Sequence, residues 1–120
     1  MSLFTADFET TTDPADCRVW AYGICEIGNP NNFIYGNDIS GFMEWAKKEK
    51  TATAYFQNLK FDGEFILCWL FENGFKHVTD RKDLKSNTFT TLISDKGQFY
   101  SMEICFNRVA VSYTHLTLPT

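Results

Sequence analysis

The sequence lacks a long apolar run, an excess of basic residues and a paired-cysteine motif. Its longest apolar run, residues 65–71, is far shorter than the roughly 20 residues that cross a bilayer, so we expect no membrane helix. The formal net charge of −4 argues against a protein that holds nucleic acid mainly through a basic surface. A site where a bound metal supplies the positive charge is compatible with it.

The cysteine and histidine positions exclude the common metal and disulfide motifs. The cysteines stand in apolar contexts without C-x-x-C spacing, which predicts buried free thiols: Cys17, Cys25, Cys68 and Cys105. His77 has no ligand partner at useful spacing, so we expect it at the surface or at a strand edge. Because no basic, then apolar, leader opens the chain, we expect no export and a reducing, cytoplasmic location.

What is present is material for a hydrophobic core. Of the 120 residues, 44% are apolar and 17% are aromatic, which predicts one globular domain. Strands are expected at 3–9, 17–28, 33–37, 51–56 and on both sides of a turn at 94–98. Helices are expected after an N-cap at Asp38 and between 58 and 74. This order predicts an α/β or α+β layer fold with one mixed sheet.

The last ten residues, 111–120, differ in composition from the rest. They are the translation of GTC TCT TAT ACA CAT CTG ACG CTG CCG ACG, which matches the mosaic-end adapter of transposase-based sequencing libraries. We therefore interpret 1–110 as the beginning of a native domain and 111–120 as adapter read-through that packs poorly and adds no buried core. A natural C-terminal segment is the alternative.

An acidic pair marks the end of the first expected strand. Asp7 and Glu9 are two residues apart and so share one face of a strand, where they repel each other unless water or a cation separates them. If strands one and four are neighbours, Asp62 joins them at the sheet edge. Three carboxylates in one cleft would favour Mg²⁺ or Mn²⁺, and two such ions about 4 Å apart support phosphodiester cleavage. The alternative is a solvated strand end.

The stretches "DFETTT", "CRVWAYG" and "YFQNLKFDGEFI" carry a resemblance. In this order and spacing they resemble the N-terminal 3′-to-5′ proofreading exonuclease domain of the protein-primed family B DNA polymerases, the phi-twenty-nine type, over residues 3 to about 108. The resemblance implies an RNase H-like exonuclease fold that is incomplete at its C-terminus. It also implies a replicative DNA polymerase as the parent protein, acting as a monomer on primer-template DNA with a terminal protein primer.

The resemblance further implies roles for individual residues. Asp7, Glu9 and Asp62 would be the catalytic ligands of two Mg²⁺ or Mn²⁺ ions. Four others would hold the single-stranded 3′ end of DNA, by polar contact or by stacking: Thr10, Asn58, Phe61 and Phe65.

Two departures and several alternatives accompany this interpretation. The family often has a histidine where this chain has Gln57, and the third exonuclease motif and the polymerase domain would lie beyond residue 110. Phe61 and Phe65 could instead be core residues, and Asn58 only a helix cap. The rival functions are a freestanding 3′-to-5′ exonuclease or RNase H-like nuclease, and a non-catalytic module that binds single strands without metal.

Overall fold

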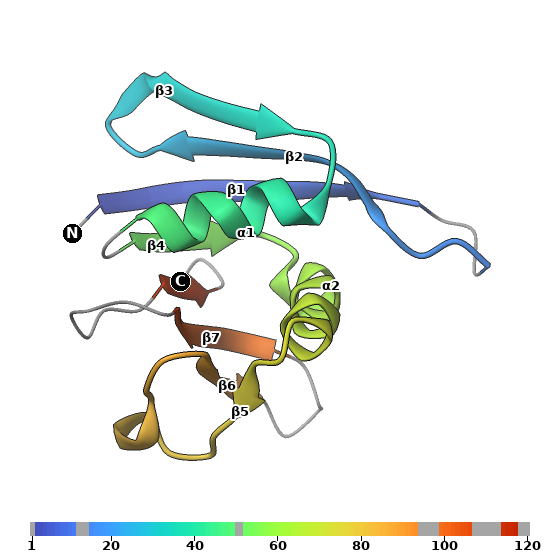
Figure 1. Cartoon of the computed structure of the whole chain (residues 1–120). Coiled ribbons are helices and arrows are strands. Elements are labelled where there is room, and N and C mark those ends of the chain that lie inside the picture. The colour runs from blue at the N-terminus through green and yellow to red at the C-terminus, as the bar shows by residue number, and fades with distance from the viewer. Residues whose placement is uncertain (1, 12–14, 50–51, 94–98, 107–113, 118–120) are drawn as a thin grey trace.

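The computed structural model describes residues 2–11, 15–49, 52–93, 99–106 and 114–117 (Figure 1). The chain opens with three antiparallel strands: β1 (Ser2–Thr10), β2 (Val19–Glu26) and β3 (Asn29–Gly36). Gly28, in the turn between β2 and β3, has φ of 88°, a conformation that glycine adopts without a Cβ clash. This meander was predicted from the sequence and is confirmed.

The predicted N-cap of the first helix, α1 (Ile39–Lys48), is also confirmed. The Oδ1 atom of Asp38 accepts a hydrogen bond of 2.8 Å from the Gly41 N–H. The helix buries Phe42, Met43, Trp45 and Ala46, and the chain then enters β4 (Ala52–Phe56), which lies parallel to β1.

The second half of the chain supplies α2 (Leu59–Glu72), β5 (Lys76–His77), the short 3₁₀ helix η1 (Arg81–Asp83), β6 (Thr88–Ile93) and β7 (Phe99–Cys105). The predicted strands on both sides of 94–98 are β6 and β7, which pair antiparallel, while the turn itself lies outside the described residues. β5 and η1 were not predicted, because two or three residues give no readable period.

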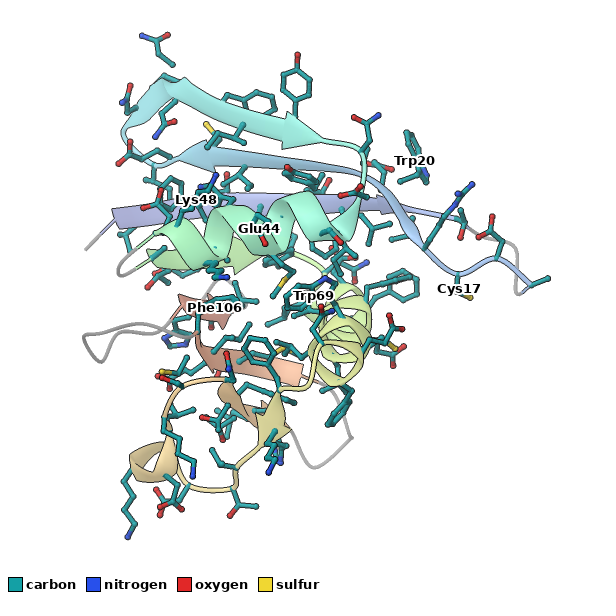
Figure 2. The ribbon with its side chains drawn as sticks, viewed as in Figure 1. Cys17, Trp20, Glu44, Lys48, Trp69 and Phe106 are labelled. Atoms are coloured by element: carbon teal, nitrogen blue, oxygen red, sulfur yellow. The ribbon has the colours of Figure 1, made fainter. Side chains whose placement is uncertain are left out.

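All the strands form one sheet in the order β3-β2-β1-β4-β8-β7-β6-β5, with parallel and antiparallel pairs. The mixed α/β class is therefore confirmed. Helix α1 packs on β1 through edge-to-face ring pairs, Phe4 with Trp45 and Phe8 with Phe42. A further aromatic series, Trp69, Phe75 and Phe106, joins α2 to the end of β7 (Figure 2).

The prediction that residues 111–120 pack poorly is wrong for 114–117. These residues form β8 (Thr114–Thr117), which pairs parallel with β4 and antiparallel with β7, and Leu116 is fully buried. β4 and β7 would otherwise present unpaired edges, and backbone hydrogen bonds accept any segment that can extend. Leu118 lies outside the described residues, and the packing of β8 does not test the DNA origin of the segment.

The cysteine prediction is partly wrong. Of the four thiols, Cys105 is buried and Cys25 partly buried, whereas Cys17 and Cys68 are exposed. Cys68 lies on α2 on the side away from the core, which its apolar neighbours in sequence do not reveal. His77 is exposed on the edge strand β5, as predicted, 3.1 Å from the Thr91 hydroxyl. Among the described helices, none is long and apolar enough to cross a membrane.

Candidate active site

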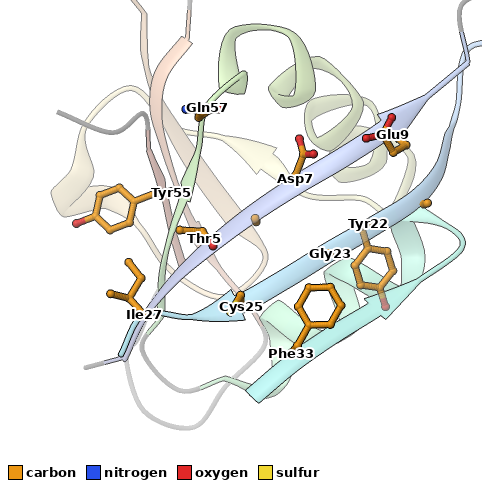
Figure 3. A pocket seen from close by; sticks show the side chains of 12 residues that line it. Thr5, Asp7, Glu9, Tyr22, Gly23, Cys25, Ile27, Phe33, Tyr55 and Gln57 are labelled. Carbon is orange, nitrogen blue, oxygen red and sulfur yellow. The ribbon is translucent and has the colours of Figure 1, made fainter. Parts of the chain in front are cut away.

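Strand alternation divides β1 between two surfaces. Phe4, Ala6 and Phe8 point into the core, and the residues between them point to the opposite face of the sheet. Asp7 and Glu9 are exposed on this second face and line a hollow of about 770 Å³ (Figure 3). The expectation that the two carboxylates share one face is therefore confirmed.

Asp62 reaches the same strand end from α2. The pairing of β1 with β4 ends at Ala6 and Phe56, so β1 continues beyond its neighbour and its edge there is open. Asp62, in the first turn of α2, fills this position, where its carboxylate accepts a hydrogen bond from the Phe8 backbone N–H. The side chain of Phe8 is locked against Phe42 and Phe56, which fixes that N–H in place.

Burial and neighbouring charge raise the pKa of Asp62 from 3.8 to about 6. The residue is only 2% exposed, and desolvation is the main cause. The negative charges of Asp7 and Glu9 add to the shift, and the Phe8 hydrogen bond opposes it. Asp62 is therefore within electrostatic range of both other carboxylates.

The donor set was tested against a metal ion. The Oδ2 atom of Asp62 is buried and has no hydrogen-bond partner, as expected for an oxygen that awaits a cation. Carboxylate oxygens are the ligands that Mg²⁺ and Mn²⁺ prefer. Within the described ranges, however, no three such side chains already converge as a preformed metal cage. The residues fit the chemistry of the ion, and metal binding stays a prediction.

A second hollow, a groove of about 850 Å³, runs along the outer side of α2. Thr10, Phe61 and Phe65 line it, and the two phenyl rings lie 5.5 Å apart at 68°. Phe61 is 45% exposed, so the alternative that it is a core residue is wrong; Phe65 is partly buried at the edge of the core. Because Glu9 and Thr10 are adjacent in β1, the groove and the acidic hollow meet at this strand end.

Asn58 occupies the N-cap position of α2, but its side chain makes no capping hydrogen bond. Its carbonyl oxygen accepts from the N–H groups of Phe61 and Asp62, at 3.0 and 2.8 Å. The side chain is exposed and lines neither hollow. The alternative that the Asn58 amide serves as a helix cap is therefore not supported.

Sequence reasoning did not single out several residues that share these hollows. Tyr55 and Gln57 lie beside Asp7 because β4 runs parallel to β1, and Cys68 and Trp69 extend the groove beyond Phe65. Trp69 follows Phe65 at i+4, so helical spacing was the available signal.

Replacing the buried carboxylate should stabilise the protein. In metal-free buffer at pH 7 we expect Asp62→Asn to raise the free energy of unfolding by on the order of 1–2 kcal/mol, because the ionised form is the one that burial disfavours. A raised folded-state pKa favours the native state below pH 4, and this contribution is lost as the pH rises through 6. The gain from Asn should therefore shrink from pH 7 to pH 4.

Urea unfolding between pH 4 and pH 8 measures this dependence. Glu64→Gln, the same charge change at an exposed position of α2, is the control and should give no such pH dependence. Equal pH dependence in Asp62→Asn and the unsubstituted chain would contradict the electrostatic picture of the site.

Comparison with known proteins places the chain in a class. No protein-family model matches the sequence. Individual relatives do match it, and they are DNA polymerases of bacteriophages. The chain spans only about a fifth of their length.

The particular relatives are polymerases of the phi29 type. The chain is 51% identical over 104 residues to the DNA polymerase of Bacillus phage Nf, covering 87% of this chain and 18% of that protein. It is 48% identical over 103 residues to that of Bacillus phage phi29, covering 86% and 17%. Phi29 DNA polymerase solved with primer-template DNA superimposes with a TM-score of 0.87 at 40% identity, over 98% of this chain and 20% of that one. Over most of its length the chain is therefore homologous to a segment of phi29-type phage DNA polymerases.

Proposed function

We propose that this chain is the exonuclease part of a replicative DNA polymerase, with an RNase H-like fold and a two-metal site that removes nucleotides from single-stranded 3′ ends. The observation that carries the proposal is Asp62, a buried carboxylate with an unpartnered oxygen within electrostatic range of Asp7 and Glu9. Such a group is costly to keep ionised without a cation.

In the proposed mechanism Asp7, Glu9 and Asp62 hold Mg²⁺ or Mn²⁺. The metal ions, when bound, activate water and stabilise the leaving oxygen of a phosphodiester. The protein's own contribution is to position the carboxylates. The Phe8 N–H orients Asp62, and the core packing of Phe8 fixes the strand that carries Asp7 and Glu9.

The groove along α2 would hold the DNA strand. The exposed ring of Phe61 and the edge of Phe65 offer stacking surfaces that any base can use, and the hydroxyl of Thr10 can bond a phosphate or sugar. Asn58, exposed beside Phe61, would supply an amide to the same strand. Glu64 and Glu72 line the groove further on and repel phosphate, so the held segment is expected to be short.

The relatives extend the proposal to the whole protein. Phi29 DNA polymerase has been solved with primer-template DNA and with single-stranded DNA. We propose the same two DNA partners for the parent protein of this chain, together with DNA synthesis and a terminal protein primer. A freestanding exonuclease is the alternative, and a longer reading of the source gene would distinguish the two by the presence or absence of a polymerase domain.

Calorimetric titration with Mn²⁺ tests the metal site in the 120-residue chain. We expect weak uptake that Asp7→Asn abolishes, because the substitution removes a negative ligand. Uptake that is absent, or that is equal in both proteins, would support a binding module that uses no metal.

Anisotropy of a labelled oligothymidylate tests the groove separately, in the absence of metal. Phe61→Ala should weaken binding by about fivefold or more, because base stacking contributes ~1–3 kcal/mol. Phe71→Ala, an exposed phenyl on the same helix that does not line the groove, is the control. Equal losses in the two variants would show that Phe61 has no special role.

A further inference from the structure

The sheet face opposite the helices presents a large apolar surface at one end of the molecule. Four of the exposed large apolar side chains of the described residues lie on it: Leu3, Ile27, Phe33 and Tyr35, with exposures of 38%, 50%, 55% and 75%. They surround the hollow that Asp7 and Glu9 line (Figure 3). Contiguous apolar surface of this kind marks a site of contact with another molecule or segment.

Strand register gives this surface the form of a trough. Thr5 pairs with Tyr55 on one side and with Cys25 on the other, and Cys25 pairs with Phe33. In the next row Asp7, Gly23 and Tyr35 are aligned in the same way. The floor over β1 and β2 is therefore made of small side chains, between walls of aromatic rings on β3 and β4.

The dimensions of the trough suit one α-helix. Four adjacent strands span about 14 Å between the outer two, since neighbours lie about 4.8 Å apart. A helix with its side chains is about 10 Å across. A floor of small residues lets such a helix approach closely, and its larger side chains would fill the space above Gly23 and Cys25.

The charges of the trough favour a polypeptide over nucleic acid. Among its lining residues there is no lysine or arginine, and the two charged ones, Asp7 and Glu9, are both acidic. A phosphate backbone laid along the trough would find no cation from the protein.

We propose that this trough, lined by Thr5, Gly23, Cys25, Phe33 and Tyr55, is the docking surface for an amphipathic helix from the four-fifths of the polymerase that lies outside the aligned region. The relatives are about five times as long as this chain, so a covering segment of the same polypeptide is available. The central strands β1, β4 and β8 pair in parallel, and parallel strands are normally covered on both faces.

Cys25 on the floor of the trough is a built-in reporter. Its alkylation by N-ethylmaleimide, followed by peptide mass spectrometry, would be compared in two metal-free proteins. One is the 120-residue chain, and the other is a chimera in which residues 2–106 replace the aligned region of phi29 DNA polymerase. We expect alkylation at least about tenfold slower in the chimera, because the docked helix must open first. Exposed Cys17 is the reference thiol.

Three outcomes would overturn the proposal. Equal rates in the two proteins would show that no segment of the polymerase covers the trough. Protection that rises with the concentration of the 120-residue chain would indicate a second copy. Protection of the chain by added oligothymidylate would indicate nucleic acid. Because the measurement uses neither metal nor catalysis, it is independent of the proposed nuclease function.

Gly23→Leu supplies a second readout. A Cβ at Gly23 would lie 3.4 Å from the Phe33 ring, an ordinary contact, so the isolated chain should tolerate the substitution. In the chimera the side chain occupies the helix position, and the β2 amides should exchange hydrogen faster than in the unsubstituted chimera. Lys48→Leu, on exposed α1, is the control. An equal effect of Gly23→Leu in both proteins would overturn the proposal.

Discussion

In a complete exonuclease domain or polymerase that carries this region, Asp7→Ala will slow the release of 3′ nucleotides from single-stranded DNA by about a thousandfold or more. The substitution removes a proposed metal ligand, and phosphodiester cleavage of this type depends on the pre-positioned charge of the ions. Asp62→Ala should have a similar effect, because it removes the buried carboxylate that the Phe8 N–H orients. The measurement is release of an end-labelled nucleotide in Mg²⁺ or Mn²⁺.

The controls separate chemistry from binding. DNA affinity of the Asp7→Ala variant should largely persist, since the stacking groove along α2 is unaltered. Glu44→Ala, an exposed carboxylate on α1, should leave the rate unchanged. The 120-residue chain itself should release nucleotides very slowly even with Mn²⁺, because the third exonuclease motif is expected beyond residue 110. Equal release by the complete domain and its Asp7→Ala variant would leave only a solvated strand end at residues 7–9.

The second large effect concerns β8. We expect Leu116→Ala to lower the free energy of unfolding by about 2–4 kcal/mol, because a fully buried leucine is replaced and a cavity remains between the sheet and the core. Removing residues 111–120 should do more harm. It would unpair β4 from β7, separate the sheet into two parts and leave two open edges that favour aggregation.

Urea unfolding followed by circular dichroism measures the first variant, and light scattering measures the truncation. His115→Gln, on the neighbouring strand position that faces away from Leu116, is the matched control and should cost less than about 1 kcal/mol. If Leu116→Ala and the truncation leave stability unchanged, residues 111–120 do not belong to the folded sheet, and the first expectation for this segment was correct.

The sequence by itself determined the local structure and the acidic pair. Period-2 alternation in β1 places Asp7 and Glu9 together on one face, and the polar cap at Asp38 begins α1 as predicted. Such features depend on residues close together in the chain. The same residues carried the resemblance to phi29-type polymerases that the relatives bear out.

Only the tertiary structure decided the rest, because it depends on which distant segments become neighbours. The early end of β4 leaves the edge of β1 open to Asp62, and no local pattern shows this. The central place of β8 follows from two strand edges that need a partner, and backbone hydrogen bonding satisfies them with little regard to side-chain identity. The trough over Gly23 exists because four strands bring their small residues into register, a property of the sheet and not of any one strand.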